Sequence, residues 1–104
     1  MRTAKVFICS KEAGHLTEMI FGKEYRFEYK EGYTGLPVSL TMPVRLKIFS
    51  FGHFPPFFDG LLPEGFQLEG LLKQGKVDRN DLFSQLMLVG NDMVGAVTVK
   101  EMEG

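Results

Sequence analysis

The sequence predicts an α+β fold: a single small domain in which an antiparallel, barrel-like β-sheet carries two helices between its penultimate and last strands. Three observations lead to this fold. A length of 104 residues suits one domain, residues 1–104. The first half alternates apolar and polar residues between short turns, which is typical of antiparallel strands. The second half has two stretches with apolar residues at helical spacing, followed by one more apolar strand.

The clearest strand is residues 25–29, YRFEY, in which aromatic and charged residues alternate. This is the pattern of a strand that buries one face. Two further strands are expected at 4–9 and 16–21, with turns at 11–15 and 22–24.

Two more strands are expected at 36–43 and 44–51. Prolines bound the first, which suits a short edge strand with Val38, Leu40 and Met42 on one side.

Helices are expected at 63–75 and 77–90, and the last strand within 90–101. Pro63 and Glu64 suit a first helical turn, where proline loses no hydrogen bond and a negative charge is favourable. The second helix has Asp78 or Asn80 as a cap for its start, and a glycine, Gly75 or Gly90, ends each helix.

The bulk composition excludes several classes of function. The formal net charge is −1, the pI is about 6.1, and lysine and arginine form no cluster. Direct nucleic-acid binding and attachment to an anionic membrane both need a concentrated basic face, so neither is expected. A single cysteine and the absence of any long apolar run favour a cytoplasmic protein.

The sequence offers little catalytic chemistry. The two histidines, His15 and His53, are far apart, and the single cysteine, Cys9, lies in an expected strand. A His53–Asp59 pair has no activated nucleophile beside it. No catalytic residue, metal ligand or cofactor is predicted, and the chain is not expected to be an enzyme.

The unusual feature is residues 54–65, FPPFFDGLLPEG, which we call the Phe/Pro segment. It contains three Phe, two Leu and three Pro. Its large apolar side chains either close the core or form a contact surface for a partner, in which rigid prolines lower the cost of ordering. Both interpretations stay open for Phe57, Phe58, Leu61 and Leu62.

Four motifs stand out together: PVSLTMP (37–43), PFFDGLLPEG (56–65), NDLFSQL (80–86) and GNDMVGAVTV (90–99). In this order they resemble the N-terminal subdomain of HipA-type serine/threonine kinases. The resemblance runs from about Tyr25 to Val99, and LLPEG is its most specific part. The chain lacks the catalytic-loop and metal-binding motifs that phosphoryl transfer needs. It therefore resembles the subdomain on its own, as in the HipS-type antitoxins of three-gene HipBST toxin–antitoxin systems.

The resemblance implies a binding role. The expected partner is a HipT-like kinase toxin, with a HipB-like DNA-binding protein as a candidate third subunit. The domain would dock on the N-lobe of the kinase, and the 57–66 loop would obstruct the active site, with Phe66 as the candidate inserted side chain. The expected partner-binding residues are Phe57, Phe58, Asp59, Leu62, Pro63, Glu64 and Phe66. Two alternatives stay open: an N-terminal fragment of a full-length HipA-like kinase, and a stand-alone adaptor domain.

Overall fold

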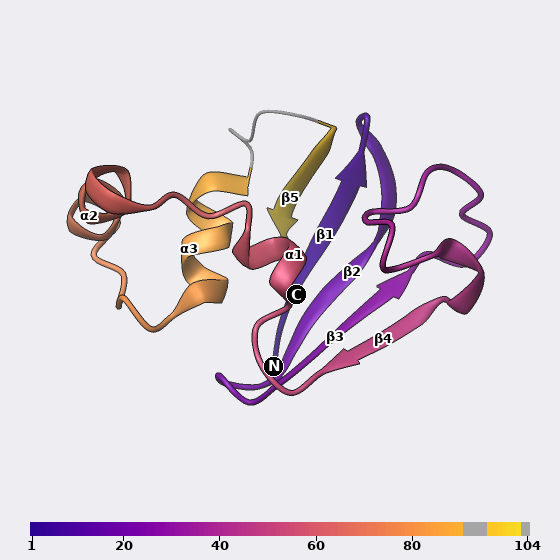
Figure 1. Cartoon of the computed structure of the whole chain (residues 1–104), viewed down its shortest axis with the longest axis horizontal. Helices are drawn as coiled ribbons and strands as arrows, with labels where there is room; N and C mark the ends of the chain where they lie inside the picture. Colours follow the sequence, from indigo (N-terminus) through magenta and orange to yellow (C-terminus); the bar gives the residue numbers. More distant parts are fainter. Residues whose placement is uncertain (91–95, 103–104) are drawn as a thin grey trace.

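The fold is an antiparallel sheet with three helices (Figure 1), in a computed structural model that describes residues 1–90 and 96–102, apart from the side chain of Phe66. The five strands lie in the order β4-β3-β2-β1-β5, and every neighbouring pair is antiparallel. Their bounds are β1 Arg2–Ile8, β2 Lys11–Ile20, β3 Glu24–Tyr29, β4 Ile48–Phe51 and β5 Val97–Glu101. The expected α+β class is confirmed, although the sheet is open rather than closed into a barrel, since β4 and β5 are its edges.

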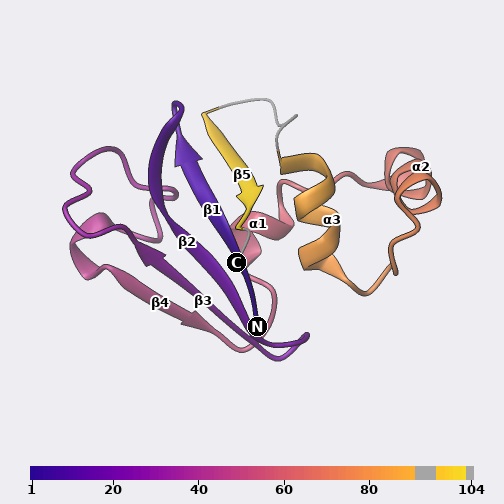
Figure 2. The ribbon, with the colours of Figure 1, turned by 180° about the vertical axis from the view of Figure 1, so that it is seen from behind.

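The helices lie between β4 and β5 in the chain. They are α1 Pro56–Asp59, α2 Gly65–Gly75 and α3 Leu82–Val89. The two longer helices were expected, and the single-turn helix α1 is an addition. Figures 1 and 2 show α3 beside the sheet and α2 at the end of the molecule, where α2 packs on α3.

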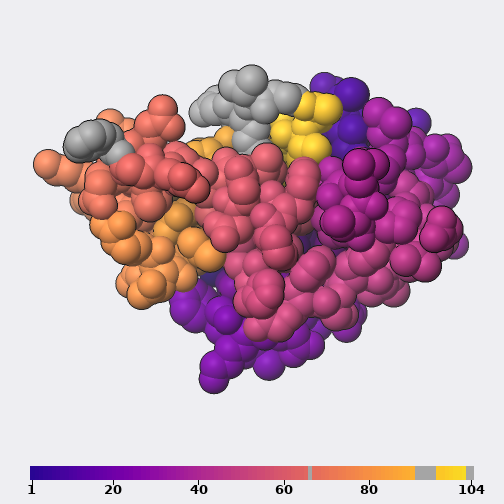
Figure 3. Space-filling model, in the orientation of Figure 1, coloured from indigo at the N-terminus to yellow at the C-terminus, as the bar shows by residue number. Residues whose placement is uncertain are grey.

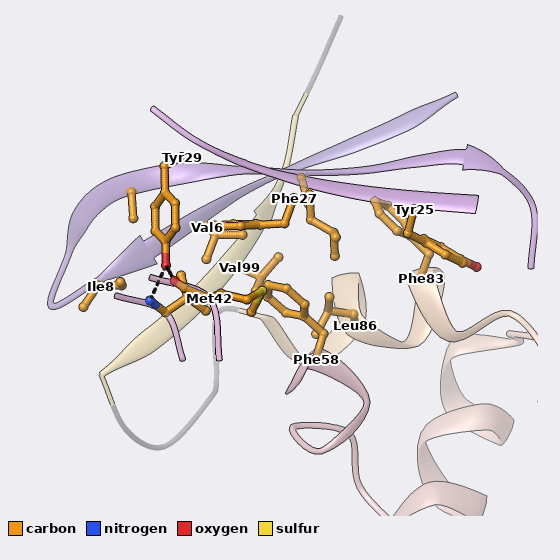
Figure 4. Close-up of a cluster of buried hydrophobic side chains, with 14 of the residues drawn as sticks. Val6, Ile8, Tyr25, Phe27, Tyr29, Met42, Phe58, Phe83, Leu86 and Val99 are labelled. Atoms are coloured by element: carbon orange, nitrogen blue, oxygen red, sulfur yellow. Dashed lines mark hydrogen bonds between the residues drawn. The ribbon is translucent and has the colours of Figure 1, made fainter. Parts of the chain in front are cut away.

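The core lies between the concave face of the sheet and helices α1 and α3 (Figure 4). Its largest fully buried apolar side chains are Phe27, Phe58, Phe83, Leu16, Leu86, Val6 and Val99. Gly90 lets the end of α3 approach β5 closely, because a Cβ there would lie 2.1 Å from the carbonyl oxygen of Val99.

The first turn was predicted in the wrong place. Residues 11–15 belong to β2, and the chain reverses at Cys9 and Ser10, which both have positive φ. A two-residue turn with two positive φ angles matches the twist of a hairpin. Gly14 is therefore a strand residue, and a Cβ there would meet the carbonyl oxygen of Glu28 at 2.3 Å.

The prediction of strands at 36–43 and 44–51 was wrong in part. Residues 36–43 form a loop with one isolated bridge between Ser39 and Met42. A 3-10 helix, Val44–Leu46, precedes β4. Only β4 itself remains of the two expected strands.

The helix boundaries also differ from those expected. Helix α2 begins at Gly65, and the left-handed residue that follows its last residue, Gly75, is Lys76 rather than a glycine. The start of α3 is capped by Asp81, whose carboxylate accepts a hydrogen bond from the backbone N–H of Ser84 at 3.1 Å. Asp78 instead accepts a hydrogen bond from the backbone N–H of Asn80.

Candidate functional site

The Phe/Pro segment forms helix α1 and the connection to α2. Pro55 and Pro56 occupy the start of α1, where the missing N–H groups cost no helical hydrogen bond. The backbone N–H of Asp59 donates to the carbonyl oxygen of Pro55 at 3.0 Å, and that of Gly60 donates to Pro56 at 3.0 Å. The prolines therefore start a helical turn instead of interrupting a regular element.

Part of the segment belongs to the core. Phe54 packs edge-on against Tyr25 with ring centroids 5.3 Å apart, and Phe58 lies 5.9 Å from Phe27. Phe58 has no exposed surface, so of the two interpretations left open for it the core one describes this structure, although Phe58 was also named among the expected partner-binding residues.

The other side of the segment faces outward. Phe57, Leu61, Leu62 and Pro63 are half-buried, whereas Asp59 and Glu64 are exposed. Figure 3 shows this face: the segment fills its middle, between residues 34–46 on one side and the two longer helices on the other. Five of the seven expected partner-binding residues thus reach the surface, and the side chain of Phe66 lies outside the described part of the chain.

The connection to α2 depends on the backbone of the LLPEG motif. Glu64 is extended, and Gly65 has a φ of 60° at the first residue of the helix. Residues other than glycine rarely adopt this left-handed backbone conformation, which explains the glycine of the motif. The position of Phe66 at the start of α2 follows from it.

A groove of about 380 Å³ lies between α1 and the edge strand β4. Its lining is mainly apolar, and it reaches the edge of the sheet at Ser50. The lining residues are Thr41, Met42, Phe49, Ser50, Phe51, Pro56 and Phe57.

Next to the groove, residues 34–43 form what we call the leucine loop. The hydroxyl of Tyr29 holds it to the core: it donates to the carbonyl oxygen of Met42 and accepts from the backbone N–H of Val38. Burial raises the pKa of Tyr29, and the Val38 N–H partly opposes this. Leu36 and Leu40 point outward and are 66% and 95% exposed. The alternation predicted Leu40 on the same side as Val38 and Met42, and this was wrong because the chain turns back between Ser39 and Met42.

An ion-pair network that sequence reasoning missed fixes α3 on the sheet. Arg2 of β1 lies 2.6 Å from the carboxylate of the buried Glu18 and 2.8 Å from that of Asp81. Its guanidinium also lies 4.8 Å from the ring centroid of Phe83. Partial burial alone would raise the pKa of Asp81, but hydrogen bonds from Arg2 and Ser84 lower it. Arg2 and Asp81 are so far apart in sequence that no local pattern indicates the pair.

The described residues show no arrangement typical of catalysis. His53 is exposed and its Nδ1 lies 3.0 Å from the carbonyl oxygen of Phe54, while His15 lies 3.3 Å from Glu12. Cys9 is exposed in the first hairpin turn. Within the described ranges, no group of three His, Cys, Asp or Glu residues could hold a metal ion. In the same part of the chain, no helix has the length and apolar character needed to cross a membrane.

Fold and surface together define a small α+β domain whose distinctive features are apolar loops beside an open sheet edge. The model of the HipA N-terminal domain family matches residues 4–100, and the chain belongs to this family. The match is to the N-terminal domain and not to the kinase catalytic domain.

Two relatives agree with this assignment. A solved structure titled "N-terminal domain of HipA toxin" superposes with a TM-score of 0.77 and 30% identity, covering 99% of this chain and 94% of that one. An uncharacterised protein of Haemophilus influenzae strain Rd is 33% identical over 101 residues, which are 97% of this chain and 93% of that protein. That relative is therefore little more than this domain.

Proposed function

We propose that this chain is an antitoxin that binds a HipA-like serine/threonine kinase toxin of the HipT type. The observation that carries the proposal is the match, along nearly its whole length, to the N-terminal domain of a HipA toxin. A separate chain with this fold can occupy, on a kinase that lacks the domain, the place that the domain has in HipA. Such a complex would form in the cytoplasm, with a HipB-like DNA-binding protein as its third subunit.

The outward side of the Phe/Pro segment supplies the contact surface. Phe57, Leu62 and Pro63 offer half-buried apolar groups, and the exposed carboxylates of Asp59 and Glu64 lie at the margin. The inward side chains Phe54 and Phe58 hold the segment in place without the partner. A surface ordered in advance loses little conformational entropy on binding, which favours a lasting complex.

The proposed inhibition is obstruction of the active site by the 57–66 loop, with Phe66 as the inserted residue. Gly65 and the extended Glu64 set the direction in which α2 leaves the segment. Phe66 directly follows this turn in the chain, which is why it is proposed as the inserted residue.

A stoichiometric titration tests the proposal. The purified chain is added to the kinase encoded beside it, and phosphorylation is followed. We expect activity to disappear with an end point near one chain per kinase. Tight binding that leaves activity intact, or no binding at all, would overturn the antitoxin role.

The variant Phe66→Ala tests the obstruction. We expect this variant to bind the kinase but to leave most of the kinase activity uninhibited. Phe21→Ala is the matched control, since Phe21 is exposed in the turn between β2 and β3 and should be dispensable. Full inhibition by the Phe66→Ala variant would rule out insertion of this side chain.

A further inference from the structure

Strand β4 has an unpaired edge. The backbone N–H of Tyr29 donates to the carbonyl oxygen of Lys47 at 2.9 Å, and the register continues with Phe27 opposite Phe49 and Tyr25 opposite Phe51. Hydrogen-bonded residues alternate along an antiparallel pair. The N–H and C=O groups of Ile48 and Ser50 therefore point away from β3, and no backbone partner for them occurs among the described residues.

The apolar groove runs beside this edge. Phe49 and Phe51 face the core side of β4, and Met42 and Phe57 complete the apolar lining, with Ser50 at the rim. On a strand added next to β4, every second side chain would point to the same side as Phe49 and Phe51. Those side chains would enter the groove.

Charge distinguishes this region from the rest of the chain. Residues 32–58 contain no Asp or Glu, although the whole chain carries 13 acidic residues. The charged side chains of this stretch are the exposed Arg45 and Lys47 just before β4. Strand β3 adds the exposed Arg26 opposite Ser50 and Glu28 opposite Ile48, so cations outnumber carboxylates around the edge. An occupant with acidic residues would be complementary to these cations.

We infer that the β4 edge is a docking site for an extended segment of another protein, with alternating apolar and acidic side chains. The segment adds a sixth strand to the sheet through Ile48 and Ser50. Its apolar residues fill the groove and its acidic residues lie near Arg45 and Lys47. This site shares Phe57 with the proposed kinase contact, but its backbone contacts are made by Ile48 and Ser50, which that contact does not use.

The experiment is an NMR titration of the full-length, isotope-labelled chain with two acetylated and amidated hexapeptides, Glu-Val-Glu-Val-Glu-Val and Lys-Val-Lys-Val-Lys-Val. We expect the acidic peptide to shift the amide signals of Ile48 and Ser50 and to slow their hydrogen exchange. Short strand peptides bind weakly, so the titration extends to about the millimolar range. The basic peptide should bind at least about tenfold more weakly, because it meets like charge.

Two variants separate the backbone and charge contributions. Ser50→Pro removes an N–H that the sheet does not use, so the fold should persist while peptide binding disappears. The double variant Arg45→Glu with Lys47→Glu should bind the basic peptide more tightly than the acidic one. Lys11→Glu with Lys23→Glu is the control, with the same change of charge on exposed residues outside this region.

Four results would overturn the inference. The first is no shift at Ile48 and Ser50 with the acidic peptide, which would mean that the edge of the short strand β4 does not pair with a further strand. The second is equal binding of both peptides. The third is binding of vesicles with anionic headgroups in place of the peptide. The fourth is self-association that Ser50→Pro abolishes, which would assign the edge to a second copy of this chain.

Discussion

Two proline-containing segments flank β4 in the chain. Neither is a regular strand, and they are fixed to the rest of the fold by different interactions. The leucine loop is held by polar bonds to the Tyr29 hydroxyl, and Leu36 and Leu40 remain in solvent. The Phe/Pro segment is held by aromatic contacts of Phe54 and Phe58. Irregular backbone can therefore be fixed either by a buried hydroxyl or by buried rings.

The difference has a consequence for binding surfaces. In the leucine loop the Tyr29 hydroxyl binds two backbone groups and the side chains of Val38 and Met42 are buried, while the two leucines face outward. In the Phe/Pro segment the anchors are its own side chains, so only some of them remain for a partner. Each segment still presents a preorganised apolar surface, which favours binding because little entropy is lost.

The largest expected effect is a difference in stability between variants of the two neighbouring phenylalanines of the Phe/Pro segment. Phe58→Ala should lower the free energy of unfolding by about 3–5 kcal/mol, because it empties a fully buried site. Phe57→Ala should cost about 1 kcal/mol, since Phe57 is half-buried. Urea denaturation of both variants measures the difference. Similar losses for the two would show that the segment has no distinct inward and outward sides.

The second prediction concerns the anchor of the leucine loop. Tyr29→Phe should cost about 1–3 kcal/mol, because the Val38 N–H and the Met42 carbonyl both lose their buried partner. Hydrogen exchange of the Val38 amide should accelerate more than that of the sheet. Tyr33→Phe removes a hydroxyl that, among the described residues, has a single hydrogen bond, to the carbonyl of Leu36, so its effect should be smaller. Unchanged exchange at Val38 in Tyr29→Phe would mean that the loop is held by its apolar contacts instead.

The two segments also show what sequence reasoning can reach. The regular strand 25–29 was predicted correctly because one face of it is buried, so the alternation of apolar and polar residues along the sequence is enough to identify it. In the leucine loop the same alternation failed, because a turn at Ser39–Met42 reverses the chain and places Leu40 in solvent. Phe57 and Phe58 are chemically identical, so only the helical turn of α1 decides which one is buried.

For the candidate site, the family motifs located the Phe/Pro segment, but they did not indicate which other segments of the chain pack beside it. Residues 34–46 and β4 are its neighbours through tertiary contacts, which no local pattern encodes. The same holds for Arg2 with Glu18 and Asp81, whose contact depends on how β1 and α3 meet.

The smallest expected effect concerns the end of the Phe/Pro segment, where backbone conformation rather than packing fixes the chain. Gly65 has a φ of 60° and open space around it, so Gly65→Ala should cost about 1–2 kcal/mol through strain alone. Gly70 of α2 is also exposed with open space around it, but its φ is not positive. Gly70→Ala should therefore stabilise the protein by about 0.5–1 kcal/mol, through the greater helix propensity of alanine.

Thermal and urea denaturation of the two variants give the signs directly. Opposite signs would show that the glycine of LLPEG is required for its left-handed backbone, and that the segment has a third anchor besides Phe54 and Phe58. The same sign for both would mean that Gly65 adopts another conformation in solution. The direction of α2, and with it the proposed presentation of Phe66, would then no longer follow from the motif.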